Sequence, residues 1–107
     1  MPINVPSETT LPIGFAARFR YQEKTMRIID YMLTKPLNTG FLTENLRKEL
    51  NLTHHDVQWA LANIFSYKVF TREKVHFYCE GWKYVYKVRP EYVPALRAFL
   101  ERNKELY

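Results

Sequence analysis

The feature that most constrains the fold lies between residues 42 and 64, where apolar residues recur at helical spacing in two runs separated by a short break. The second run has four apolar residues at i, i+3, i+4 and i+7, which is one face of a helix: Val57, Ala60, Leu61 and Ile64. Thr53 is its expected N-cap, Asp56 suits the positive helix end, and the run continues to about Tyr67.

The first run predicts a shorter helix. Thr43 is its expected N-cap, and Leu46 and Leu50 fall on its buried side. Asn51 and Leu52 then form a tight turn. Two helices joined in this way cross steeply over a shared apolar patch, so one side of the second helix stays unburied.

After Lys68 the apolar period changes from helical to two, which indicates strands. One alternating run contains Val75, Phe77 and Cys79, and another follows Gly81. The two runs predict a tight hairpin turning around Glu80 and Gly81.

Helical spacing also marks the two ends of the domain. Met26, Ile29 and Met32 belong to a helix that ends before Pro36, and Pro90 opens a last helix. Residues 1–14 are rich in proline and predict an extended arm, whereas residues 15–21 fit a helical turn or a strand equally well.

Together these elements predict one mostly helical α+β domain over residues 15–107, of the winged helix-turn-helix class. It has a three-helix core, a β-hairpin wing and a C-terminal helix. A chain of 107 residues leaves little room for a second core.

In this fold the second helix of the helix-turn-helix is the recognition helix, and its expected outer residues are His54, His55, Gln58, Trp59, Ala62, Asn63 and Ser66. Glutamine and asparagine can read adenine edges in the major groove, although an ordinary solvated face explains the same pattern. The helix has no Lys or Arg between Thr53 and Tyr67, which argues against a reader built on arginine–guanine contacts.

Basic residues gather instead in the wing region, where six stand against two acids between residues 68 and 89. The candidate DNA contacts among them are Lys68, Arg72, Lys74, Lys83 and Lys87. A second basic cluster comprises Arg18, Arg20, Lys24 and Arg27. The layout favours contacts led by the phosphate backbone, with solubilising charge on an edge hairpin as the alternative.

Two aromatic features remain open. Trp59 falls near the outer side of its helix, where it packs under the N-terminal arm, contacts a partner protein or stacks on nucleic acid. Trp82, Tyr84 and Tyr86 alternate along one strand as a core face or, alternatively, as a platform for stacked bases.

Catalysis, cofactors and small-molecule ligands find no support in the sequence. The histidines are not arranged as a site, Cys79 is the single cysteine, and with three glycines there is no phosphate-binding loop. We therefore expect no catalytic residues and no metal site. The absence of a long apolar run or a signal peptide predicts an intracellular protein without membrane contact, in the nucleus of a eukaryote or the cytoplasm and nucleoid of a prokaryote or virus.

Three short motifs resemble a known family: KTMRIIDYM at 24–32, DVQWAL at 56–61 and KYVYKVRP at 83–90. They are similar to the winged-helix domains of the general transcription factor TFIIE, in particular the central domain of its beta subunit. The resemblance implies binding of double-stranded DNA near a promoter and contact with the RNA polymerase machinery. Lys83 and Lys87 would then carry the DNA contacts.

The sequence thus favours a double-stranded DNA-binding protein acting in transcription, as an initiation factor or small regulator. The alternative is a protein-interaction module that docks in a transcription or other nucleic-acid assembly. Self-association is a further hypothesis, because the last helix carries an apolar stripe of Val93, Leu96, Phe99 and Leu100. That stripe would equally serve to cover the domain's own core.

Overall fold

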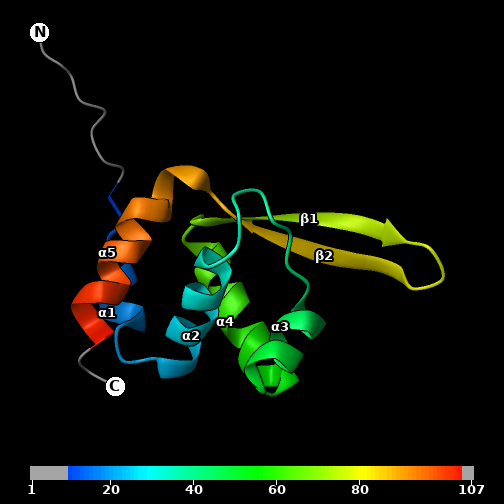
Figure 1. The fold of residues 1–107 in the computed structure, drawn as a ribbon, viewed down its shortest axis with the longest axis horizontal. Helices are drawn as coiled ribbons and strands as arrows, with labels where there is room; N and C mark the ends of the chain where they lie inside the picture. The colour runs from blue at the N-terminus through cyan, green and yellow to red at the C-terminus, as the bar shows by residue number, and fades with distance from the viewer. Residues whose placement is uncertain (1–9, 105–107) are drawn as a thin grey trace, which may run out of the picture.

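A computed structural model describes residues 10–104 of the chain. The elements follow one another as α1 (Phe15–Phe19), α2 (Glu23–Leu33), α3 (Thr43–Leu50), α4 (His54–Ser66), β1 (Phe70–Phe77), β2 (Gly81–Val88), a short 3-10 turn (Pro90–Tyr92) and α5 (Val93–Asn103). The helices form the body, and the hairpin projects from it as a wing (Figure 1). This order is that of a winged helix, as the sequence predicts. Residues 1–9 of the expected arm and residues 105–107 lie outside the described part.

The core is centred on α4, which packs against both α2 and α3. Its predicted stripe is confirmed, since all four apolar residues at i, i+3, i+4 and i+7 are fully buried. The hydroxyl of Thr53 accepts a hydrogen bond from the backbone N–H of Asp56 at 3.1 Å, which confirms the predicted cap. The corresponding prediction for α3 is wrong. Leu42 is the N-cap there, Thr43 is the first helical residue, and no side chain caps the helix.

The wing is a two-stranded antiparallel hairpin in which Phe70 pairs with Val88 and Phe77 with Gly81. The predicted turn is placed slightly too late, because Tyr78, Cys79 and Glu80 all lie in it. The backbone N–H of Glu80 donates to the Phe77 carbonyl at 3.0 Å. Cys79 has a positive φ of 67° and does not belong to the strand.

A third backbone segment ties the wing to the body. Phe41 forms an isolated antiparallel bridge with Tyr86, with N–H to carbonyl distances of 2.8 and 2.9 Å. Gly40 makes this approach possible, because a Cβ there would lie 2.5 Å from Cγ1 of Val85. The base of the hairpin is therefore fixed to the loop that precedes α3.

The two ends of the domain pack together beside α4. The segment 15–21, left open between helix and strand, forms α1, and its Phe15 and Phe19 are fully buried. Phe15 meets Phe99 of α5 with ring centroids 5.5 Å apart. Val93 and Leu96 are also buried in the core. The stripe of α5 thus covers the domain's own core. No helix within residues 10–104 combines the length and the apolar character needed to cross a membrane.

Candidate nucleic-acid interface

A groove of about 540 Å³ separates the outer side of α4 from the wing. His54, Gln58 and Ala62 of α4 form one wall, and Arg72, Trp82, Lys83, Tyr84 and Tyr86 of the hairpin form the other. Residues 42–44, at the start of α3, also line the groove. A recognition helix and a wing thus face each other across one open channel, which is the arrangement expected for a nucleic-acid interface.

The structure divides the predicted residues of the recognition helix between two sides. His54 and Gln58 face the wing, whereas His55 and Trp59 line a different hollow beside the start of α2. The side-chain amide of Asn63 is engaged in hydrogen bonds within the domain. Its side-chain oxygen accepts from Arg18 at 2.7 Å, and its NH₂ donates to the Trp59 carbonyl at 2.7 Å. Of the predicted base-reading amides, Gln58 is therefore the one presented to the groove.

Trp59 packs against α1, and residues 1–9 of the arm that was expected to cover it lie outside the described part. Its ring meets the Phe19 ring edge-on, with centroids 6.5 Å apart, and the Arg18 guanidinium lies 5.3 Å above it. It is half-buried against the core. Among the three explanations that the sequence left open, intramolecular packing accounts for its position, although the covering element is α1.

Arg72 of β1 brings to α4 the cation that α4 itself lacks. Its guanidinium lies 4.2 Å from the ring centre of Phe65 on α4 and 4.4 Å from that of Tyr84 on β2. Stacking of this kind covers the faces of a guanidinium and leaves the N–H donors around its edge available. Within residues 10–104 no carboxylate or carbonyl accepts from them. Arg72 is thus a positioned donor at the groove.

Lys83 is engaged by two carboxylates. Its Nζ lies 2.5 Å from an oxygen of Glu80 and 2.9 Å from one of Glu44. The hydrogen bonds to Glu80 and Glu44 raise the pKa of Lys83, and the hydrogen bond from Lys83 lowers the pKa of Glu44. The two acids offset the charge of the ammonium, so Lys83 is a poorer phosphate ligand than its sequence context suggests.

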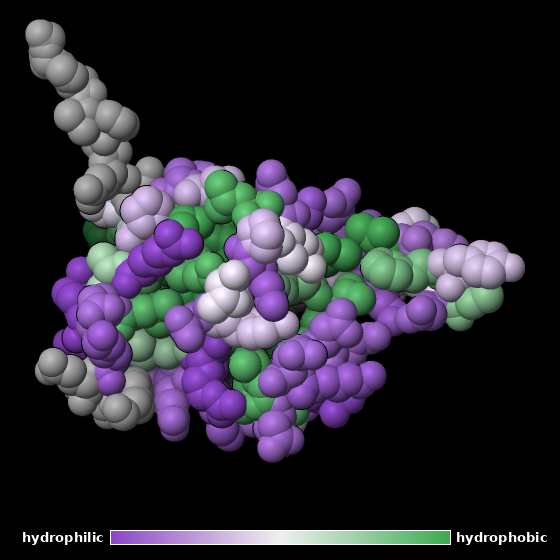
Figure 2. Space-filling view, in the orientation of Figure 1, coloured by the Kyte–Doolittle hydropathy of each residue, from purple (hydrophilic) through white to green (hydrophobic). Residues whose placement is uncertain are grey.

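The other predicted wing lysines lie on different sides. Lys74 pairs with Tyr84 across the hairpin and therefore shares the groove-facing side with Arg72. Lys87 pairs with Thr71 on the opposite face, near Gly40. Lys68 is exposed, with a positive φ of 62° directly after α4. The view in Figure 2 shows strongly hydrophilic residues over α3, whereas apolar and weakly polar residues extend along the wing.

The aromatic stripe on β2 belongs to the core at one end and to the groove at the other. Tyr86 is 7% exposed, but Trp82 is 63% and Tyr84 45% exposed. The ring of Trp82 also contacts that of His76 on β1, with centroids 5.0 Å apart. The expected core face is thus confirmed only at Tyr86. Trp82 and Tyr84 are not among the predicted DNA contacts. The alternation of aromatic residues along β2, which also fits a platform for stacked bases, is the sequence signal that points to them.

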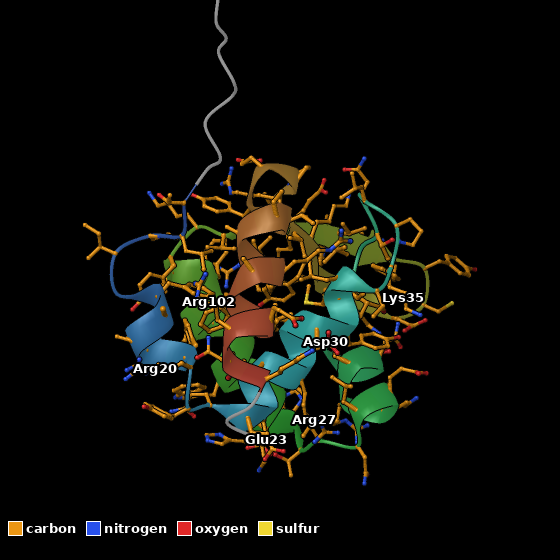
Figure 3. The ribbon with its side chains drawn as sticks, turned by 60° about the vertical axis from the view of Figure 1, so that its left-hand side comes forward. Arg20, Glu23, Arg27, Asp30, Lys35 and Arg102 are labelled. Atoms are coloured by element: carbon orange, nitrogen blue, oxygen red, sulfur yellow. The ribbon has the colours of Figure 1, made fainter. Side chains whose placement is uncertain are left out.

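A second groove, of about 630 Å³, runs between α2 and α5. Its rim contains acids and bases in similar number, and Glu23, Arg27 and Asp30 follow one another along α2 beside α5 (Figure 3). Leu33 and Leu100 contribute apolar lining. Because the remaining stripe of α5 is buried, self-association through this helix would have to use the groove, and it stays a prediction.

The fold is similar to that of a solved structure described as a possible transcriptional regulator from Methanosarcina mazei Go1. The TM-score is 0.65, and the match covers 88% of this chain and 78% of that chain. Sequence identity is 17%, so the similarity concerns the fold alone. No protein-family model matches the chain, and no curated protein matches its sequence.

Proposed function

We propose that this chain is a winged-helix transcription regulator that binds double-stranded DNA. The observation that carries the proposal is the groove between α4 and the wing. Both elements direct polar side chains into it, above all Gln58 and Arg72. An α-helix fits the major groove, where a glutamine amide can read adenine and a guanidinium can bind guanine or phosphate. The similarity to a possible transcriptional regulator supports the regulatory role. This function would place the chain with the DNA of its cell.

The binding we propose is led by the backbone, with few base contacts. One glutamine and one arginine at the groove give little scope for sequence discrimination, whereas Lys74 on the groove-facing side of the wing suits a phosphate of any sequence. The resemblance to TFIIE points to a narrower version of the same role, in which the chain binds duplex DNA near a promoter alongside RNA polymerase. We propose a binding protein rather than an enzyme.

The test is a salt series of duplex binding by fluorescence anisotropy, with two variants on α4. Gln58→Ala removes a groove residue and should weaken binding by about 1–3 kcal/mol where Gln58 contacts an adenine. His55→Ala is the matched control, because it removes a similarly exposed residue that lines the other hollow. Binding that does not weaken with salt, or an equal loss in both variants, would refute the proposal.

One observation favours a protein partner as the second candidate. Large aromatic side chains are exposed on the wing, and Tyr78 at its tip is 89% exposed. Exposed aromatic residues are typical of protein interfaces. Failure to bind duplex DNA at low salt, together with partner capture that depends on Tyr78, would favour this function. Trp59 is unsuitable for this test, because its replacement would disturb the packing against α1.

A further inference from the structure

The wing wall of the groove is more aromatic than contact with a DNA backbone requires. Phosphate contacts need cations and N–H donors, yet Trp82, Tyr84 and Tyr86 all line this wall. Two of the three rings are substantially exposed, so burial in the core does not account for them. A ligand with a flat apolar surface would match this wall.

The spacing of the two exposed rings suits a nucleobase. Residues two apart on a strand point to the same side and lie about 6.8 Å apart along it. That is about twice the 3.4 Å rise between stacked bases along a DNA strand. One base therefore fits between the levels of Trp82 and Tyr84. The groove volume of about 540 Å³ also falls within the range of sites for small organic ligands.

The charges around the groove suit a nucleotide rather than an uncharged ring. The guanidinium of Arg72 lies 4.4 Å from the ring centre of Tyr84, next to the place where a base would stack. Its N–H donors have no acceptor among the described residues, and a phosphate oxygen would supply one. The acid at the groove, Glu44, is paired with Lys83, which limits its repulsion of a phosphate.

We propose that the groove receives one unpaired DNA base, which stacks on Trp82 and Tyr84 while Arg72 binds its phosphate. This inference rests on the proposed function, since α4 and the wing must lie along the adjoining duplex. The protein then prefers a duplex with an unpaired base to a continuous one. Stacking on Trp82 supplies the preference, because a base inside an intact duplex does not reach the wall.

The experiment compares two labelled duplexes of the same sequence, one continuous and one with a single extra unpaired base. Fluorescence anisotropy gives Kd for each at one salt concentration. The unchanged protein should bind the bulged duplex about tenfold more tightly, within the range measured for one stacked base. Trp82→Ala should reduce the ratio of the two affinities to about one, because the ring supplies the contact that only the unpaired base makes; the readout is this ratio, which a loss common to both duplexes does not change.

Two variants control for the loss of an aromatic ring. Trp82→Phe keeps a stacking surface and should retain most of the preference. Tyr78→Ala removes a ring that is more exposed than Trp82 but lies in the turn, outside the groove. This variant should keep the full preference for the bulged duplex. Circular dichroism should show the native fold in every variant, because both positions are largely exposed.

The outcomes separate this inference from the proposed function. Equal affinity for the two duplexes would overturn the inference and leave duplex binding standing. An equal loss for both duplexes in Trp82→Ala would also overturn it, because the ring would then contact ordinary duplex. Failure to bind either duplex at low salt would refute the proposed duplex function and, with it, the base site that rests on it.

Discussion

Removing one charge from either face of the wing tests where DNA lies. Lys74 shares the groove-facing side with Arg72, whereas Lys87 lies on the other face. Each phosphate contact contributes about 0.9 to the slope of log affinity against log salt. Lys74→Gln should therefore make the slope shallower by about 0.9. Between about 50 and 200 mM salt, that reduces the fall in affinity about 3.5-fold relative to the unchanged protein.

Lys87→Gln is the matched control, since it removes the same charge from the same hairpin. It should leave the slope unchanged, because Lys87 lies beside Gly40 and away from the groove. The measurement is fluorescence anisotropy of a labelled duplex at several salt concentrations. If Lys87→Gln changed the slope as much as Lys74→Gln, or more, the assignment of DNA to the α4 side of the wing would be wrong.

Three further predictions concern the scaffold that holds the groove. Gly40→Ala places a methyl group 2.5 Å from Val85 and should lower the thermal unfolding temperature, at a cost of about 1–3 kcal/mol, whereas a gain in stability would contradict the close approach. Thr53→Ala should cost about 1 kcal/mol in urea unfolding because it removes the α4 cap, and Thr43→Ala should cost less because no such bond exists there. Lys24 of α2 donates a hydrogen bond to the carboxylate of Asp56 at 3.1 Å, and this bond lowers the pKa of Asp56. The ionised Asp56 therefore stabilises the fold at pH values above the pKa that this carboxyl has in the unfolded chain, and the stabilisation is lost as the pH falls below about 4. Asp56→Asn should weaken this acid dependence of the unfolding free energy.

Local periodicity was sufficient to predict the elements from α2 to α5, but not α1, because residues 15–21 fit a helical turn or a strand equally well. The stripe on α4 and the alternation after Lys68 each depend on side chains that face one core, so their spacing records the geometry directly. The errors occur at element ends. Thr43 and Leu42 compete for one cap position, and Cys79 continues the alternation although its backbone has left the strand.

The candidate site was predictable only in part, because it depends on contacts between distant segments. Helical spacing predicts that Asn63 points outward, but it does not show that Arg18 of α1 binds its amide. Nor does sequence reveal that Glu44, 39 residues from Lys83, offsets its charge. The approach of Arg72 to Phe65 likewise depends on how the hairpin leaves α4.

The attachment of the wing at its base has a consequence for affinity. The Phe41 bridge to Tyr86 and the contact of Arg72 with Phe65 hold the hairpin from two directions. A ligand therefore meets walls whose separation is set before it arrives, and binding costs little conformational entropy of the protein. It follows that replacing Phe65 with alanine, which removes the ring under Arg72 although Phe65 does not line the groove, would loosen the hairpin and weaken binding without removing a ligand contact.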